Sequence, residues 1–448
     1  MTVAGVSVIA VLVAWVIYFF FFKANDYTCS LPANVQAMVR LDVRSLKENG
    51  TVPFIGDKGK QMEQCGIDFT QPLYAFVDGS NCPGLLLPLR DAKRWQEYLK
   101  NRKIEIQRQR GYRWAQSRQW LMAFSDDRCL VLGPLSEQEM GRMRGRMITL
   151  MKQKGKQDNA LLLPLAKSEA PLCAVLSTRL VRQLSERFLP ETAALWSNEQ
   201  EGTVTMEAFM QEKCIHASVS LQATGLEHEA SLFTPLSAAD VPALGSDRMA
   251  SVSIGVNGNG LLKTLRKNPA IRTGLIALNF CLDLDMMIRS VSGAVTLSIP
   301  CADDVLPGAL LTARLQDTRF MQDRDDWAKG LSAGFGVELT ALADSAYQLQ
   351  WQDYSICFGV QENRLTACMD KPTFLQAFRK DEQTPVSHAR EADGSIMYVQ
   401  VNLPAMLEKT AFLTLLTGGG ESLTDFLAQY ETLTVSVRTN CQGIPETE

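Results

Sequence analysis

The sequence predicts an α+β protein: an N-terminal transmembrane helix followed by two tandem copies of a mainly antiparallel sheet packed with helices. Three observations lead to this prediction. One uncharged apolar segment has membrane length, alternating strand patterns and helical patterns share the rest of the 448 residues, and similar segments recur in the same order in both halves. With 46% hydrophobic and 21% charged residues, the chain can build more than one core.

The first element is the apolar segment 2–22, which carries no charged side chain. About 20 apolar residues cross a ~30 Å hydrocarbon core. The segment ends in Phe19–Phe22 followed by Lys23, without the small residues of a signal-peptide cleavage site. Residues 1–26 are therefore expected to form an uncleaved anchor and its flank, and residues 2–22 to bring the chain to a membrane.

The orientation of this anchor has two interpretations. Lys23, Arg40 and Arg44 follow the helix, so a count of positive charges places the body in the cytoplasm. The usual layout of a signal anchor and the placement of the cysteines favour the other side. We therefore expect a single-pass protein of the inner membrane with its soluble body in the periplasm.

The remaining elements recur as six ordered pairs, offset by about 213 to 236 residues. In each copy a strand enters a helix, two strands and a helix follow, and then come a strand hairpin, further helices and a long strand. The copies are predicted at 31–245 and 246–448, with the boundary in the Pro-, Ala- and Ser-rich segment 235–247. The pairs are 37–46 with 250–265, 67–77 with 282–299, 89–95 with 315–321, 124–130 with 360–366, 173–175 with 397–399, and 203–206 with 432–435.

Two local patterns predict where helices start within these copies. Asp91 and Asp317 follow strands and are placed to accept hydrogen bonds as helix N-caps. Ser136 and Glu139 have the spacing of a capping box. The helix that starts there is predicted to bury a methionine stripe, formed by Met140, Met143, Met147 and Met151.

Several sequence segments resemble those of a known group of proteins. The segments LPANVQAMVRLDV, GIDFTQPLYAFVD and LLLPLRDAKRWQEYL are similar to an uncharacterised cell-envelope family of Bacteroidota, a domain of unknown function. The resemblance covers most of the soluble part. It implies an extracytoplasmic location, and it supplies no activity and no catalytic residues.

No reaction is predicted by motif. The sequence contains no G-x-S-x-G, S-x-x-K, H-E-x-x-H or C-x-x-C pattern. His216 alternates with apolar residues and is expected on the outer face of its strand, and His228 on the next strand offers a two-histidine site without a third fixed ligand. We therefore predict no catalytic residue, no metal site and no cofactor, and whether the protein is an enzyme stays open, with a non-enzyme favoured.

Basic residues supply the candidate binding positions. Residues 90–156 hold 17 Lys and Arg against 7 Asp and Glu, with aromatic residues between them. The duplicated Arg128 and Arg364 are either paired anion ligands or partners of the acidic turns before them. The net charge of −4 argues against nucleic acid as a partner. The full set of candidate residues is Arg128, Arg364, Arg142, Arg144, Arg146 and Trp114.

The cysteines give a further prediction. Cys65 and Cys82 bracket a strand in the first copy, and Cys281 and Cys301 bracket its counterpart in the second. Because each pair of cysteines flanks an equivalent strand, we predict the disulfides Cys65–Cys82 and Cys281–Cys301, each closing a loop of about 15–20 residues.

The function expected from these patterns is a membrane-tethered envelope protein that acts as a non-catalytic binding or scaffold module, with an envelope protein or glycan as partner. Two alternatives stay open: a hydrolase acting on envelope glycan or peptide, and an anion-binding module that uses the basic region 90–156.

Overall fold

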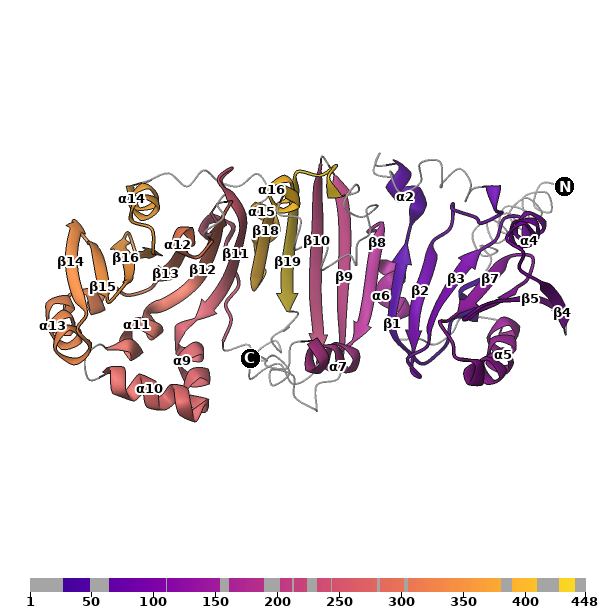
Figure 1. Cartoon of the computed structure of the whole chain (residues 1–448), viewed down its shortest axis with the longest axis horizontal. Coiled ribbons are helices and arrows are strands. Elements are labelled where there is room, and N and C mark those ends of the chain that lie inside the picture. Colours follow the sequence, from indigo (N-terminus) through magenta and orange to yellow (C-terminus); the bar gives the residue numbers. More distant parts are fainter. Residues whose placement is uncertain are drawn as a thin grey trace, which may run out of the picture. The chain divides into compact units, whose positions relative to one another are not determined.

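The structure of the chain is a computed structural model that describes residues 27–48, 64–109, 111–153, 161–188, 202–211, 213–223, 232–242, 244–279, 283–301, 305–379, 389–408 and 427–439. They belong to two compact units, Met1–Leu195 and Trp196–Glu448. Both units combine β-sheet with helices (Figure 1), which confirms the α+β class. Among the residues described, no helix is long and apolar enough to span a membrane, and the predicted anchor 2–22 lies outside them.

The first unit contains an antiparallel sheet in the order β8-β1-β2-β3-β7-β6-β5-β4. Strands β2 and β3 alternate buried residues with less buried ones, whereas β6 and β7 are buried along most of their length. The strands are β1 (Val35–Leu41), β2 (Leu73–Asp78), β3 (Pro83–Pro88), β4 (Ile106–Gln109), β5 (Tyr112–Ser117), β6 (Trp120–Phe124), β7 (Arg128–Leu132) and β8 (Leu172–Ser177).

Helices cover both faces of this sheet, but unequally. On one face a large core is closed by α5 (Glu137–Lys152), α6 (Leu162–Lys167) and η2 (Tyr27–Ser30). This core includes the buried Met38 and Phe76. On the other face α4 (Ala92–Asn101) buries Trp95 and Leu99 against Phe124. The unit also contains α2 (Val43–Glu48) and α7 (Thr178–Phe188).

The second unit contains a longer sheet in the order β9-β10-β19-β18-β11-β12-β13-β17-β16-β15-β14. All of these pairings are antiparallel except β10 with β19, which is parallel. The strands are β9 (Gly202–Gln211), β10 (Cys214–Ala223), β11 (Arg248–Asn257), β12 (Val291–Pro300), β13 (Leu310–Leu315), β14 (Glu338–Ala343), β15 (Ala346–Trp351), β16 (Tyr354–Gln361), β17 (Arg364–Cys368), β18 (Met397–Asn402) and β19 (Thr432–Thr439).

Its helices again lie on both faces. Phe374 of α14 packs into a cluster with Cys357 and Cys368, and Trp327 of α13 packs on the other face beside Phe358. The helices are η4 (Ala238–Asp240), α9 (Gly258–Lys267), α10 (Pro269–Asn279), α11 (Leu284–Ser290), α12 (Val305–Gly308), η5 (Arg319–Met321), α13 (Arg324–Phe335), α14 (Lys371–Arg379), α15 (Ala389–Ala392) and α16 (Leu403–Glu408).

Eight strands follow the same order in the two units. The series β8-β1-β2-β3-β7-β6-β5-β4 corresponds strand for strand to β18-β11-β12-β13-β17-β16-β15-β14. The second sheet then continues through β19, β10 and β9. The division into units falls at Leu195, ahead of the predicted boundary near residue 245, because β10 pairs along its length with β19.

The local helix predictions have different outcomes. The Ser136–Glu139 capping box and the buried methionine stripe of α5 are confirmed, and Asp91 caps α4 by accepting from the backbone N–H groups of Lys93 and Arg94. Asp317 does not cap the expected helix. It accepts from the N–H of Arg319 in the short turn η5, and α13 starts later, at Arg324.

Candidate binding surface

The sheet of the second unit has one face lined only by apolar side chains. Residues that face each other on neighbouring strands lie on the same side of a sheet, so the register defines rows across it. One row runs through seven strands without a polar residue, and the rows on either side of it are also apolar. The central row consists of Ala208, Ala217, Val435, Val399, Val252, Leu297 and Leu311. We call this side the apolar face of the second unit.

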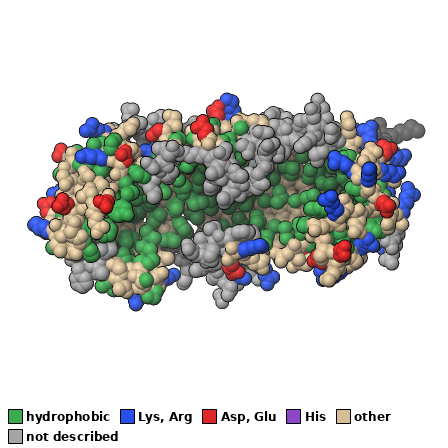
Figure 2. All heavy atoms as spheres, viewed as in Figure 1, with side chains coloured by type: hydrophobic (Ala, Val, Ile, Leu, Met, Phe, Trp, Pro, Cys, Tyr) green, Lys and Arg blue, Asp and Glu red, His purple; other side chains and the backbone are tan. Residues whose placement is uncertain are grey.

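The central row of this face is partly open to solvent, whereas Met210, Ile215 and Val401 in a flanking row are buried. Leu297 in the middle of the sheet is 42% exposed and Met206 on β9 is 44% exposed, while Val252, Val399 and Val435 are half-buried. Figure 2 shows hydrophobic side chains gathered over these strands. Monomeric soluble proteins rarely expose a contiguous apolar patch of this kind, and such patches mark interaction sites.

The opposite face of the same sheet is polar and buried. Ser253 and Thr296, which are nearly inaccessible, lie opposite each other on β11 and β12, and their hydroxyl groups are 2.7 Å apart. Ser251 donates to the side-chain oxygen of Gln400 at 3.4 Å. Each hydroxyl or amide therefore has a partner, as a buried polar group requires. The hydroxyl-rich face is the inner one, and the aliphatic face is the outer one.

The first unit has an apolar face in the equivalent position. Val39 of β1 lies opposite Ala75 of β2 and Ala174 of β8, and Ala75 lies opposite Leu85 of β3. One half of this face is covered by α4, and the other half forms an apolar groove of about 380 Å³. The groove is lined by Ala37, Val39, Ala75, Phe76, Val77, Pro83, Gly84, Leu85, Trp120, Gly133 and Pro134.

Two side chains of the groove remain accessible, since Leu85 and Trp120 are each 39% exposed. The lining supplies no carboxylate, amide, hydroxyl or basic group. Chemically, it can exclude water from an apolar ligand but cannot activate or transfer a proton. The apolar faces were missed by the sequence analysis, although the alternation of apolar residues in β1, β2, β11 and β12 was visible in it.

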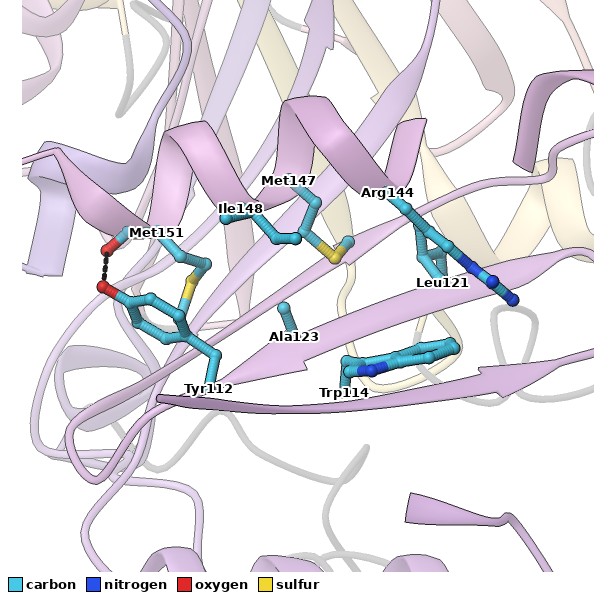
Figure 3. Close-up of a pocket in the computed structure, with 8 residues that line it drawn as sticks. All are labelled: Tyr112, Trp114, Leu121, Ala123, Arg144, Met147, Ile148 and Met151. Carbon is cyan, nitrogen blue, oxygen red and sulfur yellow. Dashed lines mark hydrogen bonds between the residues drawn. The ribbon is translucent and has the colours of Figure 1, made fainter. Parts of the chain in front are cut away.

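The basic region 90–156 contains a small cavity rather than an anion site. Arg144 lies over the ring of Trp114 with its guanidinium carbon 4.3 Å from the ring centroid, and it donates to the side-chain oxygen of Gln116. Figure 3 shows both residues beside Met147 and Met151 of α5, where the enclosed space is about 20 Å³. That space fits about one water molecule. The predicted residues Arg144 and Trp114 are thus brought together, but by contact with each other.

Other predicted arginines are also held within the fold. Arg146 lies 2.6 Å from the carboxylate of Asp78, whose other oxygen accepts from Ser80 and Cys82, so this pair closes the turn between β2 and β3. Arg142 is exposed on α5. We find no cluster of these arginines around a common point among the described residues.

Arg128 and Arg364 occupy equivalent strand starts, as the duplication predicts, but their surroundings differ. Arg128 donates to the carbonyl of Met151 at 3.0 Å and lies 3.1 Å from the sulfur of Cys29. Arg364 lies opposite Arg314 in the ladder, and burial lowers its pKa. Arg128 belongs to the first unit and Arg364 to the second, and each has contacts of its own.

The first predicted disulfide is not present in the structure. Cys82 is a buried free thiol in the core closed by α5, with its sulfur 3.6 Å from the carbonyl of Pro83, and burial raises its pKa. Cys65 belongs to the other core cluster, beside Trp95 and Leu89. The sheet therefore separates the two residues. Cys301 is a half-buried thiol, and Cys281 lies outside the described residues, so the second pairing remains a prediction.

His216 does not point to an open outer face. Its Nδ1 lies 2.7 Å from a carboxylate oxygen of Glu391 and 2.9 Å from the hydroxyl of Thr434, while the sulfur of Cys214 is 3.7 Å away. Hydrogen bonds to Cys214 and Glu391 raise the pKa of His216 to about 10. The side chain points to the other side of the sheet from Ile215 and Ala217, as predicted, but α15 covers that side at His216. His228 lies outside the described residues.

This cluster does not have the geometry of a nucleophilic triad. In a triad the nucleophile and the acid bind different ring nitrogens, so that the histidine can move a proton between them. Here the thiol of Cys214 and the carboxylate of Glu391 approach the same Nδ1, and Cys214 is buried. Within the parts of the chain that the structure describes, no group of three His, Cys, Asp or Glu residues is arranged to hold a metal.

Comparisons with known proteins identify no family for this chain. No family model matches it, and no curated protein matches it significantly. Solved structures of the protein TP0453 in crystal forms III, I and IV are similar over 76%, 78% and 78% of this chain and 91%, 93% and 95% of theirs. Their sequence identities are 9%, 9% and 8%, and their TM-scores are 0.25, 0.25 and 0.26.

Proposed function

We propose that this chain is a non-catalytic binding protein of the cell envelope, related to the Bacteroidota family that its sequence resembles. In this proposal residues 2–22 tether it to the inner membrane and the body lies in the periplasm. The apolar faces of its two sheets bind a hydrophobic partner. The single observation that supports binding is the seven-strand apolar row from Ala208 to Leu311, whose members are half-buried or exposed.

Removing apolar surface from water stabilises a complex by roughly 25 cal/mol per Å², so a row of aliphatic side chains is a strong site for any apolar partner. The same face contributes less than it could to the unit's own stability, because Leu297 and Met206 keep more than a third of their surface in water. A surface of this kind is explained by a partner.

Site-specific crosslinking in intact cells tests the proposal. The full chain would carry a photoreactive amino acid in place of Leu297 in one strain and Leu85 in another. Matched controls carry it at Ile276 on α10, which is 55% exposed, and at exposed Leu163 on α6. We expect discrete adducts at Leu297 and Leu85 and none at the controls. Equal labelling at all four positions would contradict the proposal.

The location has a separate test. In spheroplasts, added protease should degrade the body of the full chain while the membrane stays intact. Protection of the body would place it in the cytoplasm, and an N-terminus that starts after Lys23 would show that the segment is cleaved.

A further inference from the structure

We propose that the apolar groove of the first unit binds an acyl chain of an anionic phospholipid, with Arg118 beside the phosphate. This inference rests on the proposed function and names the ligand class for one of its two faces. The groove lining, the pairing of the strands below it and one nearby cation in the sequence support it.

The strands under the groove leave no backbone group for a ligand. β1 lies between β8 and β2, β2 lies between β1 and β3, and β3 lies between β2 and β7. Their N–H and C=O groups are therefore engaged in the sheet. A bound polypeptide would bring its own backbone polar groups to this surface, where they find no partner and lose their water. An alkyl chain carries no such groups and so meets no such cost.

The volume of the groove also suits a small apolar ligand. The groove holds about 380 Å³, which is within the ~300–1,000 Å³ range of small-molecule sites. Trp120 and Pro134 form part of its wall. Gly133, with φ of +146°, allows this wall, because a Cβ at that position would lie 2.9 Å from the Trp120 ring and 2.6 Å from the carbonyl of Gln119.

An exposed cation lies close in the sequence to one groove strand, two positions from the lining residue Trp120. Arg118 is in the two-residue turn between β5 and β6, two positions before Trp120, and it is exposed. None of the ion pairs found among the described residues involves it. Arginine binds phosphate through several N–H donors in a fixed geometry, so a lipid whose chain lies in the groove can place its phosphate here.

Photolabelling of the full chain in vesicles tests this assignment. Vesicles would contain a phospholipid with a photoreactive group in its acyl chain, with either a phosphatidylglycerol or a phosphatidylcholine headgroup. Labelled peptides are then identified by mass spectrometry. We expect label in the peptides that contain Val39, Ala75 and Leu85.

Three variants separate the parts of the proposal. Leu85→Glu should reduce groove labelling about tenfold, whereas Leu163→Glu, the matched exposed leucine on α6, should leave it unchanged. Arg118→Gln should reduce labelling by phosphatidylglycerol about threefold and leave labelling by phosphatidylcholine unaltered. Hydrogen exchange of β1–β3 peptides would show that each variant is folded.

Other outcomes overturn the inference. Label confined to residues 2–22, or equal label in the Leu85→Glu variant, means that the groove does not hold an acyl chain. Equal effects of Arg118→Gln on both headgroups remove the phosphate contact. If the cellular crosslinks at Leu85 contain only protein and vesicle labelling is absent, the acyl ligand is wrong while the proposed binding function stands.

Discussion

The two units share a strand order and an outward apolar face, yet they differ on the inward face. In the first unit this inward face carries Met38 and Phe76, which are buried in a large apolar core. In the second unit the strands that correspond to β1 and β2 carry Ser251, Ser253 and Thr296, which are equally buried but hydrogen-bonded. The inward face, which normally defines a fold, is thus the variable one.

The difference indicates what each face does. An inward face has to be filled and its polar groups satisfied, and both an apolar core and a hydroxyl network meet that requirement. The outward face has no such requirement, because a solvated sheet face is normally polar. That both units keep it aliphatic supports a role in binding rather than in folding.

The largest expected effect tests the inward face of the first unit. Arg40 is 8% exposed, and its guanidinium donates to the carbonyls of Leu165 and Ser168 at 2.7 Å and of Ala170 at 3.1 Å. Arg40→Ala leaves these acceptors buried and unpaired, so we expect a loss of about 4 kcal/mol in the free energy of unfolding. Urea denaturation followed by hydrogen exchange of β1 peptides measures it.

The control is the corresponding position of the second unit. Ser253 shares only one side-chain hydrogen bond, with Thr296, so Ser253→Ala should cost about 1 kcal/mol. Similar losses in both variants would mean that the two inward faces are stabilised in the same way, which would contradict the difference between the two units.

A smaller effect depends on pH and belongs to the second unit alone, since residues 1–195 contain no histidine. The folded-state pKa of His216, about 10, is above its ordinary value of 6.5. Protonation therefore stabilises the fold fully below pH 6.5, and this contribution is lost as the pH rises through 10. Because Glu391 is partly solvated, we expect a loss of about 1 kcal/mol.

Hydrogen exchange of the β19 peptide, corrected for the intrinsic effect of pH, measures this change between pH 7 and pH 10. The His216→Gln variant should lack the dependence, and peptides of β1 should show no matching step. A wild-type curve that parallels that of the variant would contradict the prediction.

The smallest expected effect on stability concerns the outward face. Leu297→Gln places a polar side chain where the leucine is already 42% exposed, so the free energy of unfolding should change by less than about 0.5 kcal/mol. Crosslinking from Val252, which lies opposite Leu297 on β11, should nevertheless fall. If the variant unfolds instead, the apolar face is part of the core and the comparison between faces is wrong.

Much of the architecture could be predicted from the sequence, because it depends on local patterns. The alternation in β1 and β11, the cap at Asp91 and the methionine stripe of α5 each follow from side chains close in the chain. Recurrence of such patterns in order also indicated equivalent strands. These inferences need no knowledge of what covers a face.

The candidate site was not predictable, because finding it requires knowledge of what covers each face of the sheet. A period of two shows that Val252 and Ser253 point to opposite sides, but it does not show which side receives the cover. The usual assumption puts the aliphatic side inward, and the second unit reverses it. The prediction of the Cys65–Cys82 disulfide was wrong, because two cysteines that flank β2 in the sequence can lie on opposite sides of the sheet.

The parallel pairing of β10 with β19 has a consequence for how the protein is made. Cys214 lies beside Thr432, 218 positions later in the chain, whereas β1 finds both its partners within the first unit. At synthesis rates of about 5–20 residues per second, β10 waits roughly 10 to 40 s for its neighbour. During that time one edge of β10 has unpaired backbone groups, and such an edge is open to pairing with other chains. Until β19 is synthesised, this edge of β10 is therefore a position at which the second unit can pair wrongly.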